Sequence, residues 1–236
     1  MAHSNIVTLS GWAQHADALR CLVPQAYALD YASAADPAMV GEKLHALGEI
    51  DVAVGWSLGG WLLMWATSHG FITPKRLVIF AAPAQFVRSA SFSHGMGQES
   101  FSLFQQNFTT QPARTVARFS HLIAHGDRHY KQVRDALENT LSPTMDATYH
   151  AHWHRWLTLL GTQGHDDIHY DALPHTTLIY GDADQIVSPD QGEWLHRRIA
   201  RSQLIMLRGC AHAPHHHQPE YMSKIIAQES THARTL

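Results

Sequence analysis

A Gly-x-Ser-x-Gly pentapeptide, Gly55 to Gly59, constrains this chain more than any other feature of its sequence. Residues 50–54 before it are rich in β-branched side chains, and residues 61–69 after it have the apolar spacing of a helix. A strand, a sharp turn and a helix would place Ser57 at the tip of the turn, with strained backbone angles and its hydroxyl above a sheet edge. Strand and helix then approach so closely that both flanking positions accept little except glycine. The alternative is a glycine-rich junction with an incidental serine, and the coincidence of strand, motif and helix disfavours it.

Length and composition restrict the class of protein. A chain of 236 residues suits one α/β domain with room for an insertion. The formal net charge of -3 argues against general nucleic-acid binding. No apolar run approaches the roughly 20 residues that a membrane span needs. Cys21 and Cys210 cannot form a disulfide framework, which agrees with a reducing compartment, and we therefore expect a cytoplasmic protein.

Twenty histidines are an unusual number for this length. They include two local groups, His150, His152 and His154 in the middle of the chain and residues 215–217 near its end. Neither group has the Cys/His spacing of a zinc site. We therefore expect polar surface histidines and no metal.

Strand and helix patterns alternate along both ends of the chain and not in its middle. A parallel sheet covered on both faces is expected where they alternate. Residues 84–173 contain only helix-like spacing and are predicted to form an inserted cap, so the core comprises residues 1–83 and 174–236. Expected strands cover 5–9, 26–31, 51–54, 76–81, 176–180 and 203–207, and expected helices cover 16–23, 36–47, 61–69, 101–108, 113–124, 129–141, 144–160, 189–199 and 219–228.

Candidate partners for Ser57 follow two later strands. A serine hydroxyl needs a base to remove its proton and a carboxylate to orient that base. Asp184 follows the strand at 176–180 and is preferred to Asp182, and His212 follows the strand at 203–207. Parallel strands bring these loops to one sheet edge, and the order Ser, Asp, His is that of α/β-hydrolases. Residues 215–217 are the alternative bases.

An oxyanion formed by serine attack needs two backbone N–H donors. Leu58, directly after the nucleophile, and Trp12, in the loop after the first strand, are the donors that their positions favour. Trp12, Trp56 and Phe119 are candidates to line an apolar acyl channel, with core packing an equally good explanation for Phe119.

These motifs resemble those of the α/β-hydrolase superfamily, and within it the pimeloyl-[acyl-carrier protein] methyl ester esterases (BioH type) of biotin synthesis. The pentapeptide marks only the superfamily, whereas the cap segments narrow the resemblance. Ser10-Gly11 replaces the family's His-Gly, and the chain begins at the superfamily's third strand, so we expect about six mostly parallel strands. The residues that carry the resemblance are Gly11-Trp12, 55–60, 104–106, 114–119, the Asp184 loop and 211–214.

Basic residues outnumber acidic ones in the first half of the cap, with six against three between residues 84 and 135. Arg114 and Arg118 are four residues apart and share a helix face, while Arg128, Lys131 and Arg134 recur every three residues and would share another. A solvated helix face explains such charges as well as an acidic partner does. The resemblance implies that cap arginines hold acyl-carrier protein and its phosphopantetheine; Arg114 and Arg118 match that pattern, and Lys131 and Arg134 match it loosely.

The sequence therefore predicts a monomeric serine carboxylesterase that hydrolyses the methyl ester of pimeloyl-[acyl-carrier protein] through Ser57, His212 and Asp184, without metal or organic cofactor. Its partner would be acyl-carrier protein, with no nucleic acid or membrane involved. One alternative is a small-molecule carboxylesterase or thioesterase without a carrier partner. The other is a hydrolase fold that has no activity and serves as a binding protein.

Overall fold

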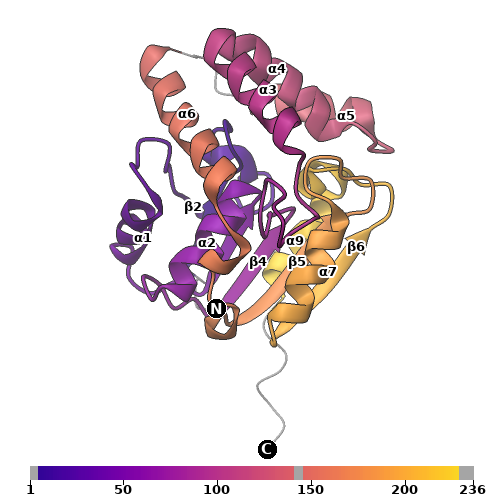
Figure 1. Ribbon diagram of the computed structural model, residues 1–236. Coiled ribbons are helices and arrows are strands. Elements are labelled where there is room, and N and C mark those ends of the chain that lie inside the picture. The colour runs from indigo at the N-terminus through magenta and orange to yellow at the C-terminus, as the bar shows by residue number, and fades with distance from the viewer. Residues whose placement is uncertain (1–4, 141–145, 229–236) are drawn as a thin grey trace, which may run out of the picture.

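Six parallel strands form the centre of the computed structural model, which describes residues 5–140 and 146–228 (Figure 1). The sheet order is β2-β1-β3-β4-β5-β6, and every neighbouring pair is parallel. The predicted α/β fold with about six strands is therefore confirmed. The strands are β1 (Ile6–Leu9), β2 (Tyr27–Ala28), β3 (Val52–Trp56), β4 (Arg76–Phe80), β5 (His175–Gly181) and β6 (Ser202–Leu207).

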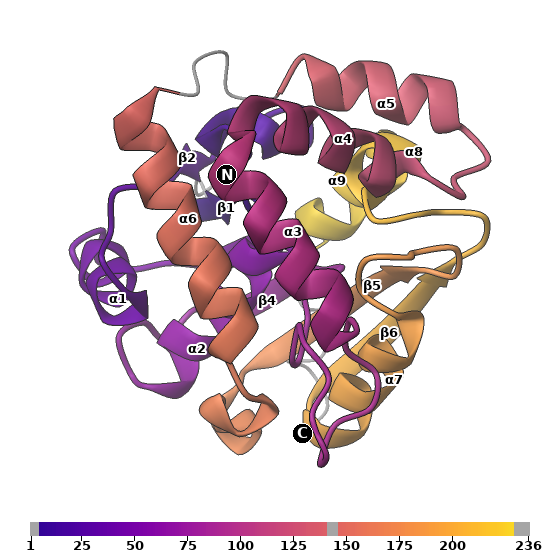
Figure 2. The ribbon, with the colours of Figure 1, turned by 45° about the horizontal axis from the view of Figure 1, so that its top comes forward.

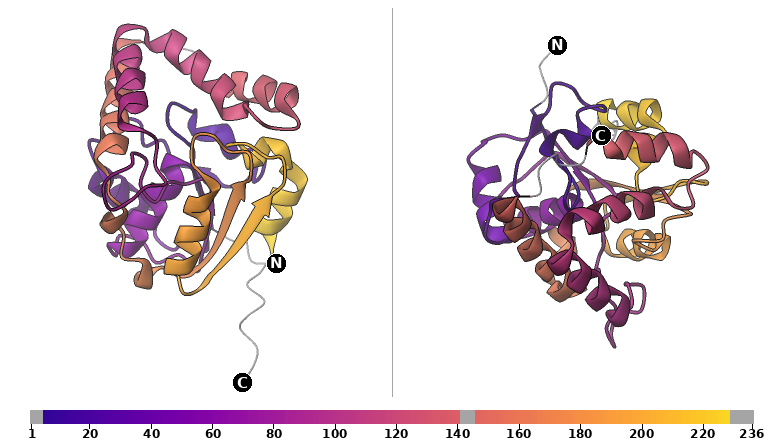
Figure 3. Two further views of the ribbon diagram at one scale, coloured as in Figure 1. Left: turned by 45° about the vertical axis from the view of Figure 1, so that its right-hand side comes forward. Right: turned by 90° about the horizontal axis from the view of Figure 1, so that it is seen from above.

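Helices cover both faces of this sheet, which explains why β3 and β4 are buried along their whole length. One face carries α1 (Pro37–His45), α2 (Leu58–Ser68) and α7 (Pro189–Arg198), and the other carries α9 (Pro219–Ala227) (Figure 3). Arg76 at the start of β4 is buried and donates hydrogen bonds to the carbonyls of Ile225 and Ile226 in the last turn of α9. Its guanidinium thereby satisfies backbone acceptors that a helix end leaves unpaired.

Two expected elements near the N-terminus are shorter than predicted. The helix expected at 16–23 is one 3-10 turn, η1 (Ala16–Leu19), and the strand expected at 26–31 is the two-residue β2. β2 lies at the sheet edge with Tyr27 exposed, so burial does not extend it. The Asp30 carboxylate then accepts a hydrogen bond from the N–H of Ala32, a local turn that ends the strand.

The segment between β4 and β5 crosses over the end of the sheet (Figure 2). The expected helices are present, although Leu141 and Thr144, which two of the predictions included, lie outside the described residues. The predicted cap boundaries at 84 and 173 fall in the connections to β4 and β5, and a separate lid role for this segment stays a prediction. It contains α3 (Gln98–Thr110), α4 (Pro112–Ala124), α5 (Tyr130–Glu138), α6 (Ala147–Thr162), η2 (His165–Asp167) and η3 (Tyr170–Ala172).

Aromatic side chains join this inserted segment to the core. The Trp12 ring lies edge-on to Phe104, Phe108 and Phe119, with centroids 4.9 to 5.5 Å apart. Its indole N–H donates to the carbonyl of Trp153 in α6 at 2.9 Å. Edge-to-face pairs contribute beyond the area they bury, so this cluster fixes the segment to the loop that follows β1.

A four-residue helix, α8 (Pro214–His217), precedes α9 and was not predicted. His215, His216 and His217 are all buried in it, so the expectation of surface histidines was wrong for this group. Pro214 begins the turn, and the His215 ring packs against Trp56 and Phe80 of the central strands. The other histidine group lies partly buried on α6. Among the described residues, no helix is both long and apolar enough to cross a membrane.

Candidate active site

Ser57 occupies a strained turn between β3 and α2. Its backbone angles are φ 53° and ψ -121°, a conformation that costs a non-glycine residue of order 1–3 kcal/mol. A Cβ on Gly55 would lie 2.5 Å from the Cα of Gly60, and one on Gly59 would lie 2.4 Å from the carbonyl oxygens of Leu9 and Ser10. The two glycines therefore allow the close contact that raises the serine above the sheet edge.

Ser57, His212 and Asp184 lie in one hydrogen-bonded row. His212 Nε2 is 3.0 Å from Ser57 Oγ, and His212 Nδ1 is 2.7 Å from Asp184 Oδ2. All three residues are buried, with His212 only 1% exposed. Low polarity around the row strengthens each of its hydrogen bonds.

The second oxygen of Asp184 fixes the orientation of the carboxylate. Asp184 Oδ1 accepts hydrogen bonds from the N–H groups of Ile186 at 2.8 Å and Val187 at 3.0 Å. Asp182, the weaker of the two candidates, is exposed and instead accepts from the N–H of Gly209 at 2.6 Å. The geometry thus agrees with Asp184 as the partner of His212.

Trp56 supports the His212 loop rather than lining a channel. Its indole N–H donates to the carbonyl of His212 at 2.8 Å, and the side chain is only 1% exposed. The expected contact of Trp56 with an acyl chain is therefore replaced by a structural one. The sequence could not reveal this structural role, because a tryptophan directly before the nucleophile could equally support a loop or line an acyl channel.

The backbone N–H groups of Trp12 and Leu58 are buried and donate no hydrogen bond to another described residue. Buried backbone donors are nearly always paired, so both residues offer a donor that no described residue uses. Leu58 is the first residue of α2, where the positive end of the helix dipole adds to its N–H. The Tyr31 hydroxyl donates to the carbonyl of Ser10 at 2.8 Å and helps to hold the Trp12 loop, in which Ala13 has a φ of 58°.

Two of the three histidines after Pro214, His215 and His216, differ from His212 in their surroundings. Burial, followed by the nearby His216 and His212, lowers the pKa of His215 well below its usual value. Burial alone lowers the pKa of His216 to about 4. Both rings are therefore uncharged at neutral pH, and neither one is hydrogen-bonded to Ser57 or Asp184.

A small apolar cavity of about 120 Å³ lies between α3 and α4. Phe119, which is also packed on Trp12, lines it together with Phe104, and Arg118 lies at its wall. Arg114 is exposed one turn earlier and donates to the side chain of Gln111. The outer face of α4 therefore combines an apolar recess with two exposed guanidinium groups.

The second expected basic face is only partly present. Lys131 is exposed on α5, but Arg134 is paired with Asp135 and Glu138 of the same helix. Arg128 precedes α5 and donates to the carbonyl of Arg208, so the expectation that it shares a helix face with Lys131 and Arg134 was wrong. Local acids and carbonyls satisfy these cations, and spacing in the sequence did not reveal that.

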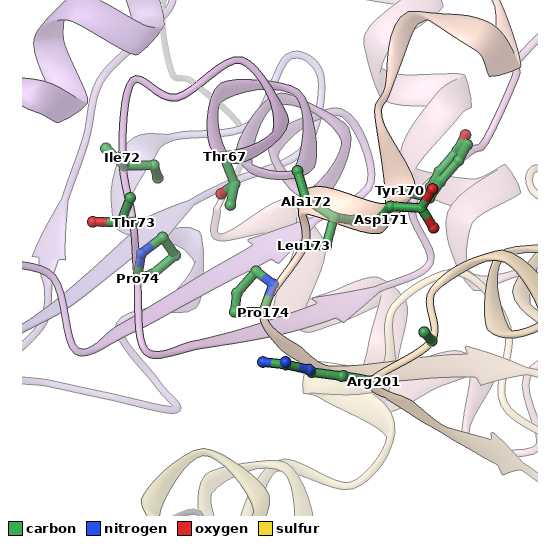
Figure 4. A pocket seen from close by; sticks show the side chains of 11 residues that line it. Thr67, Ile72, Thr73, Pro74, Tyr170, Asp171, Ala172, Leu173, Pro174 and Arg201 are labelled. Atoms are coloured by element: carbon green, nitrogen blue, oxygen red, sulfur yellow. The ribbon is translucent and has the colours of Figure 1, made fainter.

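A larger cavity of about 320 Å³ lies at the end of the sheet opposite to Ser57 (Figure 4). Pro74 and Pro174, just before β4 and β5, are among its lining residues, with Thr67 and Arg201. It therefore opens where these strands begin, whereas Ser57 lies where β3 ends. The larger of these two cavities is therefore not at the proposed active site.

One group of possible metal ligands occurs among the described residues, comprising Asp127, Cys210 and His217. The carboxylate of Asp127 already accepts hydrogen bonds from His217 Nδ1 and from the N–H groups of His129 and Ala211. The Cys210 thiol donates to the carbonyl of Ala211, and burial raises its pKa. Hydrogen bonds thus account for this cluster, which sequence spacing could not predict because Asp127 and His217 are 90 positions apart.

Comparison with known proteins identifies the family of this chain. The alpha/beta hydrolase family matches residues 6–224. The chain belongs to that family. The pimeloyl-[acyl-carrier protein] methyl ester esterase of Nitrosomonas europaea is 28% identical over 170 residues, which are 70% of this chain and 66% of that protein. The biotin biosynthesis bifunctional protein BioHC of Teredinibacter turnerae is 29% identical over 185 residues, which are 73% of this chain and 32% of that protein.

The predicted resemblance to these alpha/beta hydrolase esterases is confirmed, although the chain spans only about a third of the bifunctional relatives and just under two thirds of the Nitrosomonas esterase. Among solved structures, an esterase from Exiguobacterium antarcticum has a TM-score of 0.81 at 18% identity, covering 95% of this chain and 90% of that one. A bromoperoxidase from Bacillus anthracis has a TM-score of 0.75 at 16% identity, covering 95% and 91%. These two structures show the shared fold alone, while the family and the named esterases support the prediction of a carboxylic ester hydrolase.

Proposed function

We propose that this alpha/beta hydrolase is a serine carboxylesterase with Ser57 as nucleophile. The observation that carries the proposal is the row in which Ser57 Oγ, His212 and Asp184 are joined by hydrogen bonds of 3.0 and 2.7 Å. His212 Nε2 accepts the hydroxyl proton as Ser57 Oγ attacks the ester carbonyl, and Asp184 holds the ring and stabilises its cation. Collapse of the tetrahedral intermediate expels the alcohol, which takes the proton from His212.

Hydrolysis of the acyl-enzyme repeats these steps with water. His212 removes a proton from a water molecule that attacks the acyl carbonyl, and then returns it to Ser57 Oγ. In both halves the carbonyl oxygen becomes an oxyanion, for which the free N–H groups of Trp12 and Leu58 are the proposed donors. No metal or organic cofactor takes part in this scheme.

The substrate that we propose is the methyl ester of a pimeloyl chain carried on acyl-carrier protein. Relatives named for that reaction support it, as does the outer face of α4, where Arg114 and Arg118 lie beside an apolar recess. An acidic carrier would be steered by these exposed charges, which mainly raise association rates and fix register. We expect Lys131 to contribute to the same attraction, and Arg134 less because acids already pair with it. A cytoplasmic monomer remains our expectation.

A comparison of two substrates tests the carrier assignment. Arg114→Ala combined with Arg118→Ala should lower kcat/KM for the carrier-bound methyl ester and leave a short p-nitrophenyl ester almost unchanged, because the latter needs only the site itself. Salt should mimic the change, since screening shortens the reach of exposed charges to about 8 Å at physiological ionic strength and about 3 Å at 1 M. Arg20→Ala with Arg197→Ala, which removes two exposed arginines from the core, is the matched control.

Equal losses on both substrates would instead favour a small-molecule carboxylesterase or thioesterase with the same machinery. In that case the two arginines would support α4 rather than bind a carrier. A hydrolase fold that serves only for binding is the third possibility, and a fluorophosphonate that fails to label Ser57 would favour it.

A further inference from the structure

A second buried Asp–His pair lies beside the proposed active site. His217 Nδ1 is 2.8 Å from Asp127 Oδ1 and 3.0 Å from Asp127 Oδ2, and both side chains are completely buried. Burying a carboxylate is expensive unless several donors satisfy it, and His217 Nδ1 is one of the donors that satisfy Asp127. The mechanism above does not use either residue.

Asp127 joins the inserted segment to the loop that carries His212. Its Oδ2 accepts a hydrogen bond from the N–H of Ala211 at 2.9 Å, one residue before His212. Its Oδ1 accepts from the N–H of His129 at 2.7 Å, at the turn before α5. One carboxylate thereby links α5, α8 and the His212 loop.

Backbone hydrogen bonds reinforce this link. The N–H of His212 itself donates to the carbonyl of Ile123 in the last turn of α4 at 3.2 Å, and the N–H of Arg128 donates to the carbonyl of Gly209 at 2.8 Å. On the other side, the only core side chain described as bonding the His212 backbone is that of Trp56. The position of the base is therefore set from the inserted segment as well as from the sheet.

We propose that Asp127 is a positioning residue for His212 and that His217 holds Asp127 in the required orientation. The proposal rests on the assignment of His212 as the base. The carboxylate is needed because its two oxygens face different N–H donors, His129 on one side and Ala211 on the other. An amide in its place would turn an NH₂ group toward one of them.

Asp127→Asn should lower kcat by about 10- to 100-fold with little change in KM, because a small displacement of a catalytic group affects the chemical step more than binding. His217→Leu should have a smaller effect in the same direction, since the two backbone donors remain. His217→Asn should keep the activity that His217→Leu loses, because the asparagine amide N–H can donate to Asp127 in place of His217 Nδ1. Rates are measured on a short p-nitrophenyl ester and divided by the titre of fluorophosphonate-reactive sites, so that misfolded protein does not contribute.

Proton NMR of the whole protein supplies a readout that a merely structural role would not change. The two buried pairs predict two far-downfield imidazole N–H resonances, one from His212 and one from His217. Asp127→Asn should remove the second and shift the first. Asp166→Asn, which alters an exposed aspartate close to His165 in the same inserted segment, should affect neither signal nor rate.

Native kcat per titrated site in Asp127→Asn would overturn the proposal, and so would an unshifted His212 resonance. Failure of the proposed function is distinguishable, because it would appear as hydrolysis retained by Ser57→Ala, or as a native protein that the fluorophosphonate does not label. In that event the resonance of His212 in Asp127→Asn would still decide whether Asp127 sets its position.

Discussion

Replacement of Asp184 by asparagine tests the proposed chemistry most directly, because the structure dictates how the new amide must lie. Asp184 Oδ1 accepts hydrogen bonds from two backbone N–H groups, of Ile186 and Val187. An amide that keeps both must place its oxygen there and turn its NH₂ group toward His212 Nδ1. The native bond of 2.7 Å can then survive only if Nδ1 becomes the acceptor.

That tautomer carries its proton on Nε2, which faces Ser57 Oγ at 3.0 Å. His212 then donates a hydrogen bond to the nucleophile instead of accepting its proton. By analogy with other Ser-His-Asp enzymes we expect kcat to fall by a factor on the order of 10⁴, equivalent to about 5.4 kcal/mol of transition-state stabilisation. KM should change little, because the amide has nearly the shape of the carboxylate.

The assay is single-turnover and steady-state hydrolysis of a p-nitrophenyl ester, with thermal unfolding as the check on folding. Asp182→Asn is the matched control, since Asp182 bonds the same loop through Gly209 but not His212. Turnover within tenfold of native in Asp184→Asn would refute the tautomer argument. A greater loss in Asp182→Asn would show that the carboxylate was wrongly chosen.

Three further predictions concern activity and stability. Ser57→Ala should abolish hydrolysis yet leave the melting temperature nearly unchanged, because the positive φ strains alanine as it does serine; substantial residual turnover would contradict the assignment. Arg76→Met should lower the free energy of unfolding by about 2–3 kcal/mol, or roughly 4–12 °C in Tm by calorimetry, because two buried carbonyls lose their donor; an unchanged Tm would mean that water replaces the guanidinium. His216 has a pKa of about 4 in the folded state, below its pKa of about 6.5 in the unfolded chain. The unfolded state therefore binds a proton first as the pH falls. The free energy of unfolding should decrease between pH 6.5 and pH 4, by about 1.4 kcal/mol per pH unit. Denaturant titrations of His216→Gln should show a shallower dependence over that window, and an identical slope would exclude the residue.

The sheet and the serine turn were predictable because they depend on local patterns. Gly55 and Gly59 indicated a contact too close for any Cβ, and the structure has gaps of 2.4 to 2.5 Å at those positions. Parallel pairing then required the loops after β3, β5 and β6 to meet at one edge, which made Asp184 and His212 accessible to reasoning from order alone. Boundaries were less predictable at β2, where an exposed edge provides no burial to define them.

Contacts between distant segments were not predictable in the same way. Nothing in the run of three histidines distinguishes His217, which bonds Asp127 from α8, from His215, which stacks on Trp56. Spacing in the sequence grouped Arg134 with Arg128 and Lys131, but only the fold shows that Asp135 and Glu138 already pair with Arg134. Such details depend on which helices meet, and a count of charges along the chain carries no such information.

The nucleophile and the base depend on different parts of this fold. Ser57 is held entirely by the core, since β3, α2 and the N–H bond to Phe80 fix its turn. His212 is held from both sides, because the Trp56 indole of β3 donates to its carbonyl from the core and its own N–H donates to the carbonyl of Ile123 at the end of α4. Asp127 of the inserted segment also accepts a hydrogen bond from the preceding residue. The outer face of α4 carries Arg114 and Arg118, so a single helix contributes to both proposed roles, carrier binding along its length and base placement at its end. Substitutions on that outer face should therefore alter the choice of substrate, whereas substitutions at its last turn should alter the rate for every substrate.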